Sequence, residues 1–240
     1  MVVADPSAEL LDLIRSMGDP PPRTAPPAMI RRADLIRRRF GLALPAPFID
    51  LTVLSLDDEP MRIATAFDGT GIAAVKYRAY GTNFRGGVMP DAFLDHRDIV
   101  PPASFWTGRA MVPPSRQHRL LVWGGPGRVL GYVDCGPAHP EDVDPADIDA
   151  GVAVGEVYEL YVDPSVQGRG GGARLLAAAT DALADGRFEK LELNVLTTNV
   201  AAQRFYEQHG WEPTGRITHC EFPQVAFDEA RFTRRLVGGA

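Results

Sequence analysis

Apolar and polar positions alternate in short blocks after residue 50, so strands and amphipathic helices are predicted in turn. Residues 119–123 and 129–135 are rich in β-branched and apolar side chains and flank a Gly-Gly-Pro-Gly segment, which predicts a hairpin. Downstream, the pattern predicts a strand over 156–163, a helix over about 171–185, a strand over 191–195, a helix over 199–210 and two C-terminal strands.

The order of these elements indicates the fold class. Upstream of the hairpin, the pattern predicts a short strand over 61–66, a helix capped by Asp68 that runs through Tyr80, and another helix opening at Pro90. Antiparallel hairpins come first and a β-α-β unit follows, so we predict an α+β fold with a mixed, mostly antiparallel sheet and flanking helices. The acidic stretch 141–149 lacks the central glycine and final glutamate of a calcium loop, and we expect a solvated linker there.

The first 50 residues form a separate region. They hold eight of the 21 prolines, and these prolines isolate two short amphipathic helices, the second from about 28 to 40. We therefore predict a helical, proline-rich extension over 1–50 and a second domain over 51–240. Such short helices must bury their apolar stripes elsewhere, which favours packing on the second domain or on the partner subunit of a homodimer.

Composition narrows the class of protein. The 240 residues carry 25 Lys and Arg against 31 Asp and Glu, a net charge of −6, which argues against nucleic acid as a partner despite five arginines between residues 31 and 39. No apolar run is long enough for a membrane span, and acids stand where a secretory signal needs a basic start, so we expect a cytoplasmic protein without membrane contact. Cys135 and Cys220 have no disulfide or zinc spacing, and we predict no metal.

A glycine-rich turn joins the strand over 156–163 to the helix that follows it. Four glycines stand in the five positions 168–172, where backbone N–H groups face outward at the positive end of a helix. Such a turn favours a phosphate ligand. A P-loop would need Gly-Lys-Ser/Thr after the last glycine, which Ala173-Arg174 does not supply. A dinucleotide-binding turn would follow the strand directly, whereas 163–165 intervene and too little chain remains for that domain.

The third phosphate turn matches more closely. Gln167-x-x-Gly170-x-Gly172 resembles the acyl-CoA signature of the GNAT superfamily of N-acetyltransferases. The segment 199–211 is similar to a second motif of that family, N-x-x-A-x-x-F-Y-x-x-x-G-F, with Trp211 in place of the final Phe. The segments 156–164 and 84–91 resemble the strand before the signature and the Y-R-G-L-L-P-D stretch of one bacterial branch. The likeness covers about residues 61–236, in the family's order.

The resemblance implies a sheet whose fourth and fifth strands splay apart around the pantetheine arm of acetyl-CoA. On this basis we expect domain 51–240 to be a GNAT domain. Asn199 matches a position that often touches the CoA arm in the family, and it also suits the N-cap of the next helix. The residues that match the pantetheine strand are Leu160, Tyr161 and Val162. The residues that match the pyrophosphate turn are Gln167, Gly168, Arg169, Gly170, Gly171 and Gly172.

The same resemblance implies the reaction. Acetyl transfer needs a base for the amine, for which Glu156 is the first candidate and Glu159 the second. Strict alternation would send these two side chains to opposite faces of the strand, so at most one is expected to face the cleft. The amide of Val162 matches the donor to the oxyanion, and Tyr206 matches the acid that protonates the departing thiolate.

We therefore expect an N-acetyltransferase that moves an acetyl or other acyl group from acetyl-CoA to a primary amine of a small molecule or peptide. A non-catalytic acyl-CoA sensor or scaffold is the alternative. The family binds its acceptor between the first helices and the C-terminal strands. Here those parts carry, on one side, Tyr80, Asn83, Phe84, Arg85, Phe105 and Trp106, and on the other the residues 219–222. Core packing of these aromatic residues is the simpler expectation.

Overall fold

The computed structural model describes residue 56 and residues 59–94, 100–125, 127–222 and 225–236. The two helices predicted in the first 50 residues, and the boundary between the two predicted domains, lie outside these ranges. Within them, no helix is both long and apolar enough to cross a membrane.

The described elements follow the predicted order, and most bounds agree within two or three residues. Along the chain they are β1 (Met61–Ile63), η3 (Ala66–Asp68), α3 (Gly69–Asn83), α4 (Asp91–Leu94), α5 (Ala103–Met111), β2 (Arg119–Trp123), β3 (Gly131–Pro137), α6 (Pro145–Asp149), β4 (Val154–Val162), η5 (Pro164–Val166), α7 (Gly171–Asp185), β5 (Lys190–Leu196), α8 (Val200–Gln208), β6 (Glu212–Phe222) and β7 (Val225–Arg235). The α+β class is confirmed.

Two helices were not expected from the pattern. In α5, Trp106 is the buried large side chain while Phe105 and Met111 are exposed, so the segment lacks a continuous apolar stripe. The acidic stretch, predicted as a linker, contains the short helix α6. Its first turn is stabilised because the Asp144 side chain accepts a hydrogen bond from the Ala146 N–H at 2.9 Å.

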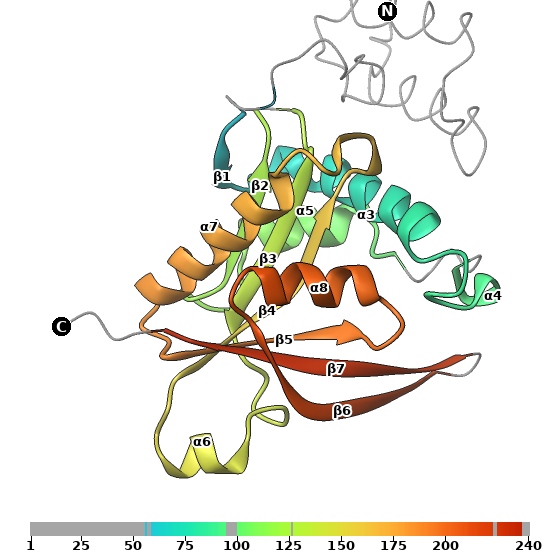
Figure 1. The fold of residues 1–240 in the computed structure, drawn as a ribbon. Coiled ribbons are helices and arrows are strands. Elements are labelled where there is room, and N and C mark those ends of the chain that lie inside the picture. Colours follow the sequence, from blue (N-terminus) through green and yellow to red (C-terminus); the bar gives the residue numbers. More distant parts are fainter. Residues whose placement is uncertain (1–55, 57–58, 95–99, 126, 223–224, 237–240) are drawn as a thin grey trace, which may run out of the picture. The chain divides into compact units, whose positions relative to one another are not determined.

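The strands of the described residues form one sheet in the order β1-β2-β3-β4-β5-β7-β6. All neighbours are antiparallel except β4 and β5, which run parallel. These two strands pair only over Val154–Glu156 and Lys190–Glu192, although both continue for several residues beyond that point. The splay that the resemblance implied is therefore present, and the two strands separate visibly in Figure 1.

A β-bulge interrupts β4 at Tyr158. In the pairing with β3, Asp134 lies opposite Glu159 and the next residue, Cys135, lies opposite Val157, so Tyr158 has no partner. An extra residue reverses the alternation of side chains beyond it. The prediction that Glu156 and Glu159 point to opposite faces is therefore wrong, because strict alternation does not account for a bulge.

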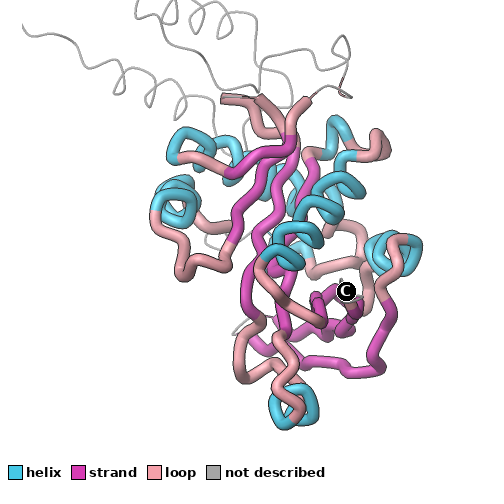
Figure 2. Tube along the Cα trace, turned by 90° about the vertical axis from the view of Figure 1, so that its left-hand side faces the viewer, coloured by secondary structure: helices cyan, strands magenta, loops and turns pink. Residues whose placement is uncertain are grey.

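Helices cover both faces of the sheet (Figure 2). On one face, α3 and α5 bury a core with strand residues of β2 and β3; its members include Ile72, Val75, Trp106, Leu120, Val122 and Tyr132. On the other face, α7 buries a stripe of Leu175, Leu176, Ala179 and Leu183. Each fully buried leucine contributes roughly 2 kcal/mol, so packing holds α7, and with it the glycine-rich turn, against the sheet.

Candidate active site

The edge of β4 that faces β5 is unpaired after Glu156. At the far end of the strand, the Asp163 N–H donates to the Leu130 carbonyl at 2.8 Å, on the β3 side. Because successive N–H groups of an extended strand point to opposite edges, the Val162 N–H points toward the gap between β4 and β5. By the same alternation, the backbone groups of Leu160 and Val162 face the gap, whereas those of Tyr161 face β3. The binding of pantetheine by this segment stays a prediction.

The turn after β4 is anchored by one carboxylate. Asp163 Oδ1 accepts from the Ser165 N–H at 3.0 Å, and Oδ2 accepts from Arg78 Nε on α3 at 2.8 Å. Gln167 closes the turn, because its side-chain Nε2 donates to the Val162 carbonyl at 3.1 Å. The end of the strand and the start of the turn are thus tied together at the mouth of the gap.

The glycines of the turn have two different structural roles. Gly168 and Gly170 have φ values of +77° and +79°, a conformation that side chains disfavour. Gly171 instead allows close packing, since a Cβ atom there would lie 2.1 Å from the Trp123 ring. The first amides of α7 have no acceptor within the helix, and Arg169 is exposed beside them. The six predicted phosphate-turn residues therefore lie together next to the gap, with exposed amides in a geometry that suits an anion.

Helix α8 brings two further predicted residues to this region. Asn199 is its N-cap, and the side-chain Oδ1 accepts from the Ala202 N–H at 3.1 Å. Phe205 faces the turn, since a Cβ atom on Gly172 would lie 3.5 Å from its ring. Tyr206 packs beside Phe205, with ring centroids 5.3 Å apart, and burial raises the pKa of Tyr206 to about 12.

Glu156 is the buried carboxylate at the point of divergence. Glu156 is the last residue of β4 that pairs with β5, and only 6% of its surface is exposed. Burial raises the pKa of Glu156, and hydrogen bonds from His139 oppose that rise. A carboxylate with a raised pKa at the end of a gap is well suited to accept a proton from a substrate.

Glu159 has a different environment. Its Oε1 forms an ion pair with Lys76 Nζ of α3 at 2.5 Å, and its Oε2 accepts from the Tyr132 hydroxyl at 2.7 Å. Lys76 is 4% exposed and lies among the rings of Tyr80, Trp106 and Tyr161, at 5.5–5.7 Å from their centroids. One oxygen of Glu159 thus holds the buried Lys76 cation, and the other accepts a hydrogen bond from Tyr132.

Strand β7 adds two charged groups that the sequence pattern did not indicate. Burial raises the pKa of Glu229, and the charges of Glu156 and Asp142 add to that rise. Arg231 is buried and forms an ion pair with Glu192 Oε2 at 2.7 Å. Period-two alternation puts Glu229 and Arg231 on one face of β7, but only the pairing of β7 with β5 brings that face beside Glu156.

The predicted acceptor-side aromatics divide into two groups. Trp106 belongs to the core between α3, α5 and the sheet, where its ring meets Tyr132 at 5.0 Å. Tyr80 and Phe84 instead form a second cluster with Tyr161 and residues of β5 and β7. Across from them, His219 pairs with Asp228 at 2.7 Å rather than with its neighbour Cys220.

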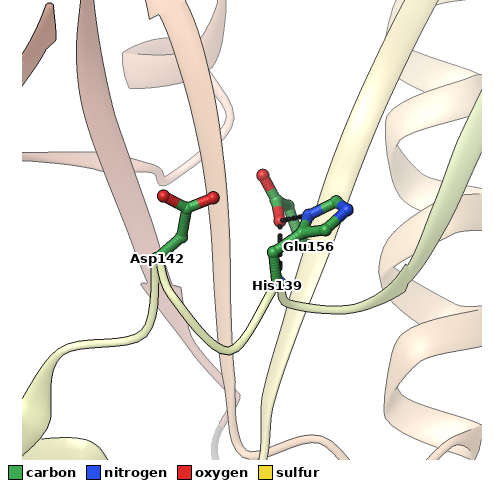
Figure 3. Close-up of side chains that lie close together, drawn as sticks. All are labelled: His139, Asp142 and Glu156. Carbon is green, nitrogen blue, oxygen red and sulfur yellow. Dashed lines mark hydrogen bonds and ion pairs between the residues drawn. The ribbon is translucent and has the colours of Figure 1, made fainter.

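One group of three side chains has the composition of a metal site. Ligand atoms of His139, Asp142 and Glu156 lie within 4.8 Å of one another. Figure 3 shows the three side chains together. The guanidinium of Arg231 lies 3.6 Å from Asp142 Oδ1, and its charge also lowers the pKa of Glu156. A fixed positive charge at this distance opposes the binding of a cation.

Comparisons with known proteins agree with this geometry. The model of the acetyltransferase (GNAT) family matches residues 88–211. An N-acetyltransferase of Streptomyces griseus is 31% identical over 132 residues, which are 53% of this chain and 64% of that protein. A mycothiol acetyltransferase of Brachybacterium faecium is 29% identical over 191 residues, which are 78% of this chain and 50% of that protein. The chain thus matches less than two thirds of either relative's length.

Solved structures share the fold. An acetyltransferase from Salmonella typhimurium, determined with acetyl-CoA, superposes with a TM-score of 0.57 at 18% identity, over 76% of this chain and 96% of that one. A GCN5-related N-acetyltransferase from Kribbella flavida superposes with a TM-score of 0.55 at 20% identity, over 76% of this chain and all of that one.

Proposed function

Because this chain belongs to the acetyltransferase (GNAT) family, we propose that it transfers an acetyl group from acetyl-CoA to a primary amine of a small molecule or peptide by direct attack. The observation that carries the proposal is the divergence of β4 and β5 after Glu156, beside the glycine-rich start of α7. The gap offers unpaired strand amides, and the turn offers helix-terminal amides. These donors suit the amides of pantetheine and the pyrophosphate of CoA, respectively.

The proposal assigns the binding of acetyl-CoA to two adjacent segments. Within the segment 160–162, the backbone groups of Leu160 and Val162 would pair with pantetheine, while Tyr161 keeps its pairing with β3. The amides of 167–172 would hold the pyrophosphate, with Arg169 adding a charge-assisted contact. Asn199 would contact the CoA arm as well as capping α8. The open space around Gly168 and Gly170, where an added Cβ meets no atom within 4 Å, supports this assignment.

Glu156 is the general base in this proposal. An attacking amine must be neutral, and Glu156 is a buried carboxylate whose raised pKa improves it as a proton acceptor. Glu159 is less suitable, because Lys76 and Tyr132 occupy both of its oxygens. We therefore assign Glu159 to the support of β4 and α3.

Two hydrogen-bond donors would act while the tetrahedral intermediate forms and breaks down. The Val162 N–H points to the gap and would stabilise the oxyanion. Tyr206, with a pKa of about 12, stays protonated at neutral pH. Full proton transfer to a thiolate with a pKa of about 8.5 would cost roughly 5 kcal/mol. We therefore assign Tyr206 as a hydrogen-bond donor to the departing sulfur.

The acceptor amine would approach from the sheet face that carries Glu156 and Glu229. Tyr80 and Phe84, packed near Tyr161, provide apolar surface on the α3 side of this face. The carboxylates favour an acceptor that arrives as a cation. This part of the site therefore favours an acceptor with an ammonium group, and it does not specify the remainder of the acceptor molecule.

The test is release of CoA from acetyl-CoA with a panel of primary amines, with wild type beside Glu156→Gln. We expect turnover with at least one amine and a loss of about 100-fold or more in the variant, at unchanged acetyl-CoA affinity. Binding of acetyl-CoA without turnover of any amine would instead support the alternative, a sensor or scaffold. No binding of acetyl-CoA would contradict both.

The proposal also covers the cellular location, the acceptor class and the oligomeric state of the enzyme. Cys135 and Cys220 are both free thiols, Cys135 being buried, which is consistent with a reducing cytoplasm. The net charge of −6 favours a small-molecule or peptide acceptor over nucleic acid. A homodimer is compatible with the proposal and is tested by the molar mass in solution.

A further inference from the structure

The two oxygens of Glu156 have unequal surroundings. Oε2 accepts the backbone N–H of His139 at 3.4 Å and lies 3.2 Å from His139 Nδ1. Oε1 has a weaker contact, with Asn194 Nδ2 at 3.5 Å. Figure 3 shows the His139 contacts meeting at one oxygen. One side of the carboxylate is therefore held, and the other is nearly free.

The loop that carries His139 is itself anchored. The Ala138 N–H donates to the Val154 carbonyl at 3.0 Å, and the Asp142 N–H donates to the His139 carbonyl at 2.9 Å. The His139 ring meets the Tyr158 ring edge-on at 5.2 Å, and its side chain is 57% exposed. The backbone of His139 is thus fixed over β4, while its ring connects the buried Glu156 with solvent.

We propose that His139 is a positioning residue for Glu156: its backbone N–H and its Nδ1–H both donate to Oε2, so that Oε1 is left to take the proton of the acceptor amine. This inference rests on the proposed function, because it gives Glu156 the role of base. The tautomer it requires carries hydrogen on Nδ1, and Nε2 then faces water.

Other charged and polar groups near Glu156 do not replace these donors. They come from β4, from the same loop, from β5 and from β7: Tyr158, Asp142, Asn194, Glu229 and Arg231. Arg231 lowers the pKa of Glu156 only at a distance, because its guanidinium bonds Glu192 and the Asp142 carbonyl. Among the described residues, His139 and Asn194 are the ones that donate to Glu156.

These contacts predict how the pKa of Glu156 changes when the His139 side chain is removed. A hydrogen bond to the ionised form of a carboxyl group stabilises that form and lowers its pKa. Removing the His139 side chain takes away one of the two donors to Oε2. In His139→Ala the pKa of Glu156 should therefore be higher than in the wild type, and a higher pH is needed to ionise the base.

The direct experiment is an NMR titration of protein labelled with 13C at the glutamate side-chain carboxyl, the Glu156 signal being assigned by its loss in Glu156→Gln. We expect the midpoint of the Glu156 titration to move to higher pH in His139→Ala. In His139→Asn, whose side-chain N–H can replace Nδ1–H, we expect it to return toward the wild-type value. Because the titration reports the protonation of Glu156 directly, this measurement needs no acceptor amine.

A matched control removes packing as an explanation. His118 also contacts the Tyr158 ring, at 5.8 Å, and its Nε2 lies 3.2 Å from the Tyr158 hydroxyl. We expect His118→Ala to leave the Glu156 midpoint in place. Equal midpoints in wild type and His139→Ala, or equal shifts in His139→Ala and His118→Ala, would overturn the inference.

The inference and the proposed function fail in different ways. If Glu156→Gln keeps the wild-type turnover with the best amine of the panel, the role of Glu156 as base is wrong. If Glu156→Gln is inactive but His139→Ala leaves the midpoint unchanged, the base assignment remains and His139 is not its positioning residue. Added imidazole should restore the wild-type midpoint in His139→Ala, because the missing ring is exposed to solvent.

Discussion

Glu156 on β4 lies opposite Glu192 on β5 in the last pair that joins these two parallel strands. Glu192 is neutralised by Arg231 and Lys190, at 2.7 and 2.8 Å, whereas Glu156 has neither ion pair. One carboxylate of the pair therefore stabilises the sheet, and the other remains available at the opening of the gap. This asymmetry supports the choice of Glu156 as the proton acceptor.

Acetyl-CoA should stabilise the protein through the glycine-rich turn. At about 100 times its dissociation constant, a ligand adds about 2.7 kcal/mol, which should raise the melting temperature by roughly 5–10 °C. Gly170→Asn tests the turn, because asparagine tolerates positive φ better than other side chains and still places atoms where the pyrophosphate would bind. We expect a folded variant with little or no thermal shift.

Gly215→Asn is the matched control for Gly170→Asn. Gly215 is on β6, has a φ of +80°, and an added Cβ there meets no atom within 4 Å, as at Gly170. The control should keep the full shift with acetyl-CoA. Loss of the shift in both variants, or in neither, would show that the turn is not the pyrophosphate site.

Tyr206→Phe should lower turnover without affecting binding. The substitution keeps the ring that packs near Phe205, Trp211 and Phe232 and removes only the hydroxyl donor. The loss of a donor to developing charge typically costs about 100-fold in turnover. Steady-state kinetics with acetyl-CoA, combined with a thermal shift, separate the two effects. An unchanged turnover number would limit Tyr206 to packing.

Glu159→Gln should destabilise the protein rather than abolish the chemistry. The variant leaves the buried Lys76 without its charge partner, which should cost about 3 kcal/mol in the free energy of unfolding. The double variant Lys76→Met, Glu159→Gln should recover most of that loss, because no buried charge remains. Urea unfolding measures both. A single variant that is stable but has lost turnover would instead point to Glu159 as the base.

Asp134 predicts a specific dependence of stability on pH. Burial raises its pKa from 3.8 to about 6, against the opposing effect of Arg109. The folded protein therefore keeps a proton that the unfolded chain has released, so this contribution to stability is complete below the unfolded pKa and is lost as pH rises through about 6. In Asp134→Asn the side chain does not titrate, so the free energy of unfolding does not decrease in this way.

The comparison of Asp134→Asn with wild type isolates this effect. Between about pH 4.5 and about pH 7.5, the difference in unfolding free energy should change by about 2 kcal/mol in favour of the variant. Urea unfolding at several pH values provides the measurement. Parallel stability curves for the two proteins would show that Asp134 keeps its ordinary pKa in the fold.

Local patterns in the sequence were sufficient to predict most elements and the glycine-rich turn. The stripe of α7, the cap at Asn199 and the four glycines at 168–172 are determined by residues close together in the chain, because helix periodicity, capping and positive φ act over a few positions. The family motifs lie in the same segments. For that reason the fold class, the splay and the place of the glycine-rich turn could be predicted.

The tertiary structure alone decided how the carboxylates are used. The bulge at Tyr158 depends on the register between β3 and β4, and it sets the faces of Glu156 and Glu159. The contacts of Lys76 with Glu159 and of His139 with Glu156 join residues that are 83 and 17 positions apart. Such pairs depend on packing between distant elements, which periodicity within one element does not contain.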